Sequence, residues 1–318
     1  MLPISVEVPE VRPTESIIKV STDSLKILPK IQRQIGHGGQ GVVYKGHWKT
    51  TDVAVKLMAL NNKSKPFIEK EIEALSKLKH PNICALVGWY IQNIIDSTPM
   101  VALVTDFYSG GELFAKIIHE QMSENDVMIM FRQIFDAVFY IHSKDVMHCD
   151  IKLENIVLTS NGTPILIDFG LTNTVNSGTL FYTAPEARNM LHKGIDIWAL
   201  GICLWACLTQ SFPFTQAHID CLRYKAVLES KSASMCDAIY SLNGNNCLFS
   251  LNVKQLLDSM LCVDHKRRYT IGDVQDKMRV YCNIEQHRKA DRIEHGKADE
   301  GKGCNVGDVE KKRRRIVY

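Results

Sequence analysis

Several short runs of this 318-residue chain hold side chains that could carry phosphate chemistry. Gly36, Gly38 and Gly41 fit the pattern G-x-G-x-x-G-x-V, in which glycines let backbone N–H groups approach phosphates closely. Taken alone, the pattern fits a phosphate-binding loop and a plain glycine-rich hairpin about equally well. Lys56 ends the apolar run at 53–56, where an ammonium group is costly to bury unless anions meet it. The two features together point to a site for a phosphorylated ligand.

A second group of polar residues follows about a hundred positions later. Asp150, Lys152 and Asn155 lie within one run, His-Cys-Asp-Ile-Lys-Leu-Glu-Asn, and Asp168 opens the run Asp-Phe-Gly. Ala-Pro-Glu comes next, at 184–186. Any one of these carboxylates is more often a turn or helix-capping residue than a catalytic one. Their fixed order with the glycine run and the lysine reverses that reading, because five ordered elements do not plausibly arise by chance.

These elements make the sequence resemble the eukaryotic protein kinase family, serine/threonine type, over residues 31–282. The resemblance implies an α+β, bilobal protein kinase fold. Its N-lobe, at 31–105, is small and β-rich with one main helix. A hinge at 106–109 leads into a larger, mostly helical C-lobe at 110–282.

The resemblance also implies roles for the polar residues. Asp150 is expected to be the catalytic base that accepts the proton of a substrate hydroxyl, and Lys152 to contact the γ-phosphate. Asn155 and Asp168 are expected to hold two Mg²⁺ ions through oxygen ligands. Lys56 is expected to hold the α- and β-phosphates of ATP.

In the same family, the lysine pairs with a glutamate on the N-lobe helix. Glu71 fits the family pattern best among three candidates. Glu69 and Glu73 share the opposite face of the helix, about 200° away at about 100° per residue. We therefore expect Glu71 to pair with Lys56.

The nucleotide site is expected to extend beyond the charged residues. The resemblance implies that apolar side chains sandwich the adenine ring, that two hinge residues present backbone groups to its edge, and that the glycine run covers the phosphates. The expected nucleotide-binding residues are Gly36, Gly38, Gly41, Val43, Ala54, Lys56, Asp106, Tyr108 and Val157.

The implied activity is transfer of the γ-phosphoryl group of Mg-ATP to Ser/Thr hydroxyls of protein substrates. The sequence resembles the serine/threonine class of the family at two places: Lys152 follows Asp150, and Thr179 follows Gly178. A pseudokinase scaffold is disfavoured because every catalytic position is occupied. A small-molecule phosphotransferase is not expected to keep the glutamate of Ala-Pro-Glu with Arg268 as its partner. The subfamily and the physiological substrate stay open.

Two further features concern substrates and regulation. Glu112 and Glu154 match positions that face the residues preceding the target hydroxyl in kinases with basic substrates, so arginine is expected two or three residues before it. Cys149 stands where most of the family has arginine. A thiol cannot bind a phosphate through charge-assisted, bidentate contacts, so we do not expect activation by loop phosphorylation. Cys149 itself is expected to be a small buried residue.

The periodicity of apolar residues indicates the elements that position these groups. Strands are expected at 41–48, 52–58, 83–92 and 100–107, with one helix at 65–78. Further helices are expected at 112–119, 124–142, 194–209, 217–228, 253–262 and 271–281.

Composition sets the remaining limits. Hydrophobic residues make up 45% and charged residues 23%, which is typical of a soluble globular chain and excludes collagen or wholesale disorder. The longest apolar run, at 197–208, has twelve residues, whereas a bilayer span needs about 20. Ten cysteines without a C-x-x-C pair indicate a reducing compartment. No membrane span and no specific nucleic-acid partner are expected.

The two ends of the chain differ from the middle. Residues 1–30 contain four prolines and are expected to form an N-terminal extension. The net charge of +3 comes from residues 283–318, which hold ten basic and seven acidic residues and are expected to be a disordered tail. The basic run at 311–315 could direct a cytoplasmic protein to the nucleus. The oligomeric state stays open.

Overall fold

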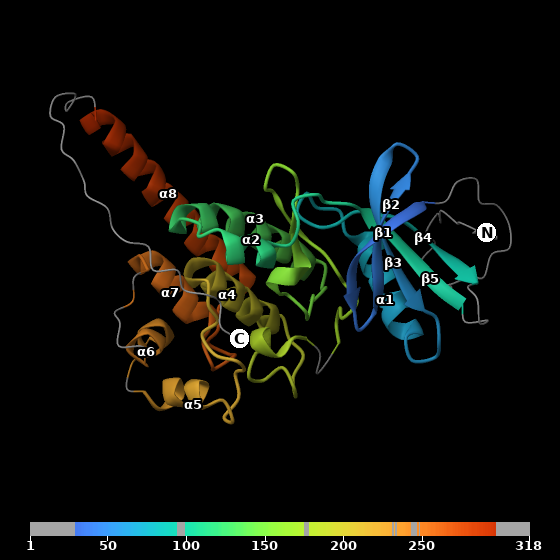
Figure 1. Ribbon diagram of the computed structural model, residues 1–318. Helices are drawn as coiled ribbons and strands as arrows, with labels where there is room; N and C mark the ends of the chain where they lie inside the picture. Colours follow the sequence, from blue (N-terminus) through green and yellow to red (C-terminus); the bar gives the residue numbers. More distant parts are fainter. Residues whose placement is uncertain are drawn as a thin grey trace. The chain divides into compact units, whose positions relative to one another are not determined.

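The computed structural model describes residues 29–93, 99–174, 178–230, 232, 234–242, 247 and 249–296. The first part holds β1 (Lys30–Gly38), β2 (Gly41–Trp48), β3 (Thr51–Ala59), α1 (Lys65–Lys77), β4 (Leu86–Asn93) and β5 (Pro99–Asp106). Helices dominate the rest: α2 (Leu113–His119), α3 (Glu124–Ser143), α4 (Gly194–Thr209), α5 (Leu222–Glu229), α6 (Met235–Leu242), α7 (Leu251–Met260) and α8 (Ile271–Gly296) (Figure 1). A short hairpin, β6 (Ile156–Leu158) and β7 (Pro164–Leu166), lies between them in sequence. The predicted α+β fold class is confirmed.

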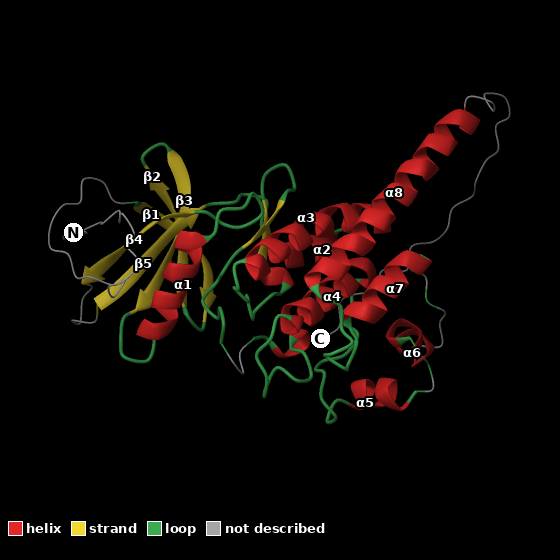
Figure 2. Cartoon of the chain, turned by 180° about the vertical axis from the view of Figure 1, so that it is seen from behind, coloured by secondary structure: helices red, strands yellow, loops and turns green. Residues whose placement is uncertain are grey.

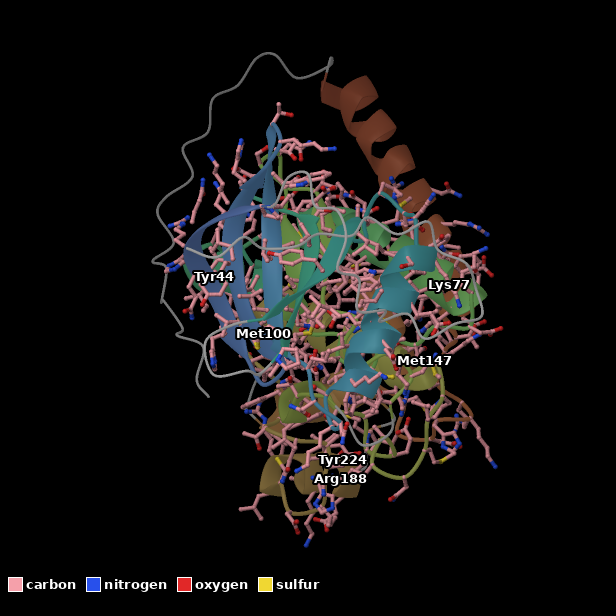
Figure 3. The ribbon with its side chains drawn as sticks, turned by 90° about the vertical axis from the view of Figure 1, so that its right-hand side faces the viewer. Tyr44, Lys77, Met100, Met147, Arg188 and Tyr224 are labelled. Carbon is pink, nitrogen blue, oxygen red and sulfur yellow. The ribbon has the colours of Figure 1, made fainter. Side chains whose placement is uncertain are left out.

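The five long strands form one antiparallel sheet in the order β1-β2-β3-β5-β4. Alternation along β3 separates its two faces, because successive strand side chains point to opposite sides. Val53, Val55 and Leu57 join a buried apolar cluster on one face, against which Tyr44 and Met100 pack (Figure 3). The intervening residues of β3 therefore face the other side of the sheet.

Helix α1 lies against this sheet, beside β4 (Figure 1). A proline in its first turn favours its start, since proline has no N–H to leave unsatisfied there. Ile68, Ile72 and Leu75 are buried, as expected from their helical spacing, whereas Phe67 is exposed. Glu71 is the buried acidic residue on the same face. The predicted helix at 65–78 is thus confirmed to within one residue.

The chain divides into two compact units. The first, here called the strand-rich unit, runs to Ala115 and resumes over Tyr140–Gly178; the second, the helical unit, comprises Lys116–Phe139 and the chain from Thr179 on. The segment that holds Asp150 and Asp168 therefore belongs to the same unit as the sheet, whereas the sequence-based prediction placed it in the helical C-lobe at 110–282. Backbone pairing explains this difference, because β7 bonds to the segment after α1: Leu166 N–H donates to the Asn82 carbonyl and Cys84 N–H to the Leu166 carbonyl.

The helical unit is organised around α4 (Figure 2). Almost every residue of this helix is buried, from Ile195 to Cys207, and it packs against α7, which in turn packs against α8. Such an all-round apolar helix of sixteen residues is a core element. Among the described residues, no helix is both long enough and apolar enough to cross a membrane.

Three helices differ from the sequence-based expectation. α6 was not predicted. α5 begins at Leu222 rather than 217, because residue Cys221 has an extended backbone and the preceding residues form a turn that buries Ala217 without a helix.

α8 was expected to end at 281 but continues to Gly296. The expectation of a disordered tail is therefore wrong for 283–296, where the sequence has no proline and no glycine before Gly296 and is rich in strong helix formers. Of the predicted extension at 1–30, residues 1–28 lie outside the described residues and Lys30 already begins β1; the tail from 297 on, with its basic run at 311–315, also lies outside them.

Candidate active site

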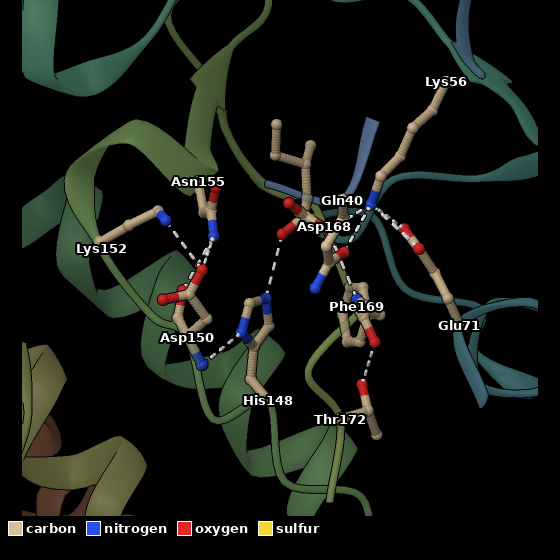
Figure 4. Close-up of polar contacts among 12 residues, drawn as sticks. Gln40, Lys56, Glu71, His148, Asp150, Lys152, Asn155, Asp168, Phe169 and Thr172 are labelled. Carbon is tan, nitrogen blue, oxygen red and sulfur yellow. Dashed lines mark hydrogen bonds and ion pairs between the residues drawn. The ribbon is translucent and has the colours of Figure 1, made fainter. Parts of the chain in front are cut away.

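The ammonium group of Lys56 lies at the centre of a polar cluster in the strand-rich unit (Figure 4). Its Nζ donates to both carboxylate oxygens of Glu71, at 2.9 Å each, and to Oδ1 of Asp168 at 2.7 Å. The amide Oε1 of Gln40 accepts a further hydrogen bond from Nζ at 3.0 Å. β3 supplies the lysine, α1 the glutamate and the Asp-Phe-Gly run the aspartate. The expected pairing of Lys56 with Glu71 is present in the structure.

One cation shared by two carboxylates sets the protonation of this cluster. Burial opposes charge on Lys56, but the negative charges of Glu71 and Asp168 outweigh it and raise the pKa of the lysine. Burial raises the pKa of Glu71 to about 7, with repulsion from Asp168 adding to the effect. Burial also acts on Asp168, yet the charge and hydrogen bond of Lys56 keep the pKa of this group below its usual value. Asp168 is therefore the more strongly ionised carboxylate of the two.

Asp150 forms a second polar cluster in the same unit (Figure 4). Its Oδ2 accepts hydrogen bonds from Nδ2 of Asn155 at 3.0 Å and pairs with Nζ of Lys152 at 2.8 Å. Asn155 also donates to the backbone carbonyl of Asp150 at 2.9 Å. Both Asp150 and Asn155 are buried, so these contacts fix the direction of the carboxylate.

The two clusters are tied together by the backbone around His148. Its Nε2 lies 3.0 Å from the carbonyl of Ile167, and its ring lies against that of Phe169, with the centroids 4.8 Å apart and the planes tilted by 55°. Cys149 and Asp168 have φ angles of 64° and 61°, in the left-handed region that non-glycine residues rarely adopt. Such backbone persists only where surrounding contacts hold it, and it is concentrated at functional sites.

The residues expected to bind magnesium present oxygen atoms of the right kind. Asn155 uses its Nδ2 in the contacts above, which leaves its amide oxygen to accept. At Asp168, both Lys56 and the Gly170 N–H contact Oδ1, so Oδ2 remains for a cation. No set of three or more His, Cys, Asp or Glu residues in the described chain is grouped to hold a metal. Phosphate oxygens and water would have to complete the coordination, which is how Mg²⁺ is ordinarily bound.

The expected nucleotide-binding residues lie on paired strands. Gly36 pairs with Val43, and Val43 pairs with Lys56, so the glycine run sits at the turn of the β1–β2 hairpin beside the lysine. Ala54 pairs with Thr105, which places both on the same face of the sheet as Lys56.

The remaining expected positions lie at the strand ends. β5 ends at Asp106, whose N–H donates to the Ala85 carbonyl, and Tyr108 follows. Burial raises the pKa of the Tyr108 hydroxyl to about 12. Val157 lies in β6 and bridges to Glu112.

Gln40 is a site residue that the sequence analysis missed. It occupies the variable position directly before Gly41 in the glycine run, and its side chain reaches Lys56 from there. No local sequence pattern links Gln40 to Lys56, which lies sixteen positions away, so the contact could not be predicted.

Cys149 is buried, as expected, with Sγ 3.7 Å from the Met147 carbonyl. Thr172, one of the hydroxyl residues that follow Asp168, is also buried, and its Oγ1 donates to the Phe169 carbonyl at 2.6 Å. The hydroxyl is therefore occupied within the fold.

The helical unit holds another buried ion pair. Arg268 contacts Glu186 through both guanidinium nitrogens, at 2.5 and 3.0 Å, and donates to the carbonyls of Cys262 and Gly194. His192 Nε2 lies 3.0 Å from the same glutamate. Burial alone would raise the pKa of Glu186, but the bonds and charge of Arg268 hold it below its usual value. The expected partnership of Glu186 with Arg268 is confirmed.

Comparison with known proteins agrees with this geometry. A sequence model of the protein kinase domain matches residues 30–278. The maternal embryonic leucine zipper kinase of Danio rerio is 31% identical over 291 residues, 85% of this chain and 40% of the relative. The putative sperm motility kinase W of Mus musculus is 36% identical over 261 residues, 77% of this chain and 49% of the relative. CBL-interacting serine/threonine-protein kinase 21 of Arabidopsis thaliana is 31% identical over 220 residues, 63% of this chain and 51% of the relative. The chain spans about half the length of these relatives, or less.

Proposed function

Because this chain belongs to the protein kinase family, we propose that it is an active, ATP-dependent kinase that phosphorylates serine and threonine hydroxyls of proteins. One observation carries the proposal. Lys56 is joined to Glu71 and Asp168 while Asp150 is held by Asn155 and Lys152, so both halves of a phosphoryl-transfer site are assembled at once. A pseudokinase that lacked one of these groups would leave a cluster incomplete.

The chemistry follows from the two clusters. Lys56 supplies a fixed positive charge for the α- and β-phosphates, with Gly36, Gly38 and Gly41 offering backbone N–H groups. Asp150 accepts the proton of the substrate hydroxyl as the hydroxyl oxygen attacks the γ-phosphorus, and the bond from that phosphorus to the β,γ-bridging oxygen breaks to release ADP. Lys152, already beside Asp150, offsets charge on the γ-phosphoryl oxygens during transfer.

The residues present also fit magnesium. Asn155 and Asp168 would hold it through their amide and carboxylate oxygens. When bound, Mg²⁺ supplies positive charge that offsets the charge developing on the transferred group. The adenine ring is proposed to lie between Val43, Ala54 and Val157, against the backbone of Asp106 and Tyr108.

The substrate sequence is proposed from two acidic residues. Loss of solvent around its carboxylate raises the pKa of Glu112, and repulsion from Glu154 raises it further. The two carboxylates are therefore close enough to interact, and an arginine would relieve their repulsion through charge-assisted bonds. We accordingly propose a preference for arginine two or three residues before the target hydroxyl. A peptide array with arginine scanned through these positions tests this preference.

We also propose that activity does not require phosphorylation of the segment after Asp168. Cys149 carries no charge to bind a phosphate, and Thr172 is buried. Protein treated with phosphatase should therefore keep most of its activity.

The cellular location is proposed to be cytoplasmic, or nuclear through the basic run at 311–315. Fluorescent fusions with and without residues 297–318 distinguish the two locations.

The test of the main proposal is phosphate transfer from Mg-ATP to a generic basic protein. Wild type should incorporate phosphate on Ser and Thr, and Asp150→Asn should lose several orders of magnitude in rate while still binding ATP. Equal incorporation by the two proteins would contradict the proposal, and so would wild-type protein that binds ATP without transferring phosphate.

A further inference from the structure

Gln40 lies in the turn between β1 and β2, next to Gly41, which packs closely against β3. The neighbouring Gly41 has a φ of 151°, and a Cβ at this position would overlap the Leu57 carbonyl. Only glycine lets the loop approach β3 this closely. The approach brings the Gln40 amide down onto the Lys56 ammonium, with 3.0 Å between Oε1 and Nζ (Figure 4).

The other side of the Gln40 amide meets the Asp-Phe-Gly run. A Cβ built on Gly170 would overlap Oε1 of Gln40, and the carboxamide carbon and nitrogen lie close by. Gln40 therefore occupies the space between Lys56 and the backbone at 168–170. Both of its neighbours are parts of the proposed phosphate-transfer site.

The hydrogen bonds of Lys56 show which contact is the easiest to exchange. An ammonium group has three N–H donors. Two of its acceptor groups, Glu71 and Asp168, are carboxylates at 2.9 and 2.7 Å, and the third is the neutral amide of Gln40. Hydrogen bonds to ionised acceptors are roughly twice as strong as bonds to neutral ones. The bond to Gln40 is thus the weakest of the set.

We infer that the amide oxygen of Gln40 occupies the acceptor position at Lys56 that a nucleotide phosphate oxygen takes, so that Gln40 competes with the phosphates and sets the affinity for them. This inference rests on the proposed use of ATP. A phosphate oxygen is an anionic acceptor, and it displaces the amide from Lys56 when nucleotide binds. The residue at this position of the loop therefore determines phosphate affinity without touching the adenine.

Calorimetric titration with Mg-ADP and, separately, with adenosine tests the inference. Gln40→Ala removes the competing bond and should bind Mg-ADP about two- to tenfold more tightly. Gln40→Glu puts a carboxylate on Lys56 and should bind Mg-ADP at least about tenfold more weakly, because the new bond is charge-assisted and the new charge repels phosphates. Adenosine has no phosphate, and its affinity should be the same in every variant.

Gln34→Ala is the matched control, since Gln34 is an exposed glutamine of β1 that lies outside the glycine run. It should leave both affinities unchanged. Weaker or unchanged Mg-ADP binding by Gln40→Ala would overturn the inference, since Gln40 would then support the phosphates or have no effect on them. If the wild-type protein bound neither adenosine nor Mg-ADP, the proposed function itself would be overturned, and the inference with it.

Discussion

Two largely buried ion pairs of this kinase are built from the same charges but differ in how the cation is shared among its acceptors. In the helical unit, Arg268 binds Glu186 bidentately and gives two further donors to two backbone carbonyls. In the strand-rich unit, Lys56 is divided between two carboxylates and a neutral amide. The pKa of Glu186 lies below its usual value, whereas burial raises the pKa of Glu71 to about 7. We call the first pair saturated because one carboxylate takes two donors of a single cation, and the second unsaturated because its cation is divided among three acceptor groups.

The difference follows from the cations. A guanidinium group is a planar fork with five donors that matches a carboxylate, and it suits a permanent contact. An ammonium group is a compact charge with three rotatable donors, and it can exchange one partner for another. The pair of Arg268 and Glu186 stabilises the fold and needs no exchange of partners. Under the proposed function Lys56 binds a phosphate, so one of its hydrogen bonds, the one to Gln40, has to be weak enough to be given up.

The largest effect is expected at the unsaturated pair. Lys56→Arg keeps the charge but cannot place one point charge among three acceptors, so kcat/KM should fall by about 10²–10³-fold with little change in Tm. Lys77→Arg is the control, because Lys77 is an exposed lysine near the end of α1, paired with Glu73 (Figure 3). Full activity of Lys56→Arg in a steady-state assay would mean that the geometry of the ammonium is unimportant.

The saturated pair should respond in stability instead. Arg268→Lys loses the fork at a fully buried position and leaves part of the network around Glu186 unsatisfied, which should lower the free energy of unfolding by about 3 kcal/mol. Urea denaturation measures this change. Arg279→Lys, at an exposed pair with Asp276, should change it by less than about 0.5 kcal/mol. If Arg268→Lys and Arg279→Lys lowered the free energy of unfolding equally, the buried pair of Arg268 and Glu186 would contribute no more to stability than an exposed pair.

The two ion pairs should also respond differently when the pH is lowered. Glu71 becomes protonated as the pH falls through about 7, which weakens its hold on Lys56. Mg-ATP affinity should therefore fall several-fold, up to about tenfold, between pH 8 and pH 6. Calorimetric titrations across this range measure it.

Protonation of Glu71 is expected to affect the stability of the fold in the opposite direction from its effect on Mg-ATP affinity. The folded state binds the Glu71 proton more tightly than the unfolded chain, so this group does not lower Tm as the pH falls from 8 to 6. Glu186, whose pKa is lowered, stays ionised throughout. Glu71→Gln should flatten the pH dependence of Mg-ATP affinity, and a steep dependence that survives in this variant would assign it to another group.

The smallest effect is expected at His192. Burial lowers the pKa of this histidine, with Arg268 and His265 adding to the effect, so its bond to Glu186 is made by a neutral ring near pH 7. His192→Gln keeps a donor within reach and should change the free energy of unfolding by less than about 1 kcal/mol. A loss as large as that of Arg268→Lys would show that the histidine, rather than the arginine, satisfies Glu186.

Much of the site could be predicted from the sequence because kinase motifs are local runs. The helix at 65–78, the choice of Glu71 among three glutamates, and the burial of Cys149 all follow from spacing and residue type. The prediction of a disordered segment at 283–296 was wrong because it counted apolar residues and gave no weight to the helix propensity of a run without proline or glycine.

The sequence determined the order of its motifs and, through the resemblance to kinases that these motifs carry, the fold class, the positions of the lysine and carboxylates, and the chemistry expected of them. Only the tertiary structure decided how these groups share their charges. Lys56 meets Asp168 across 112 positions of sequence and Gln40 across 16, and neither contact has a local pattern that announces it. The raised pKa of Glu71 is likewise a property of packing, because the cost of its charge depends on how completely the folded chain removes water from it.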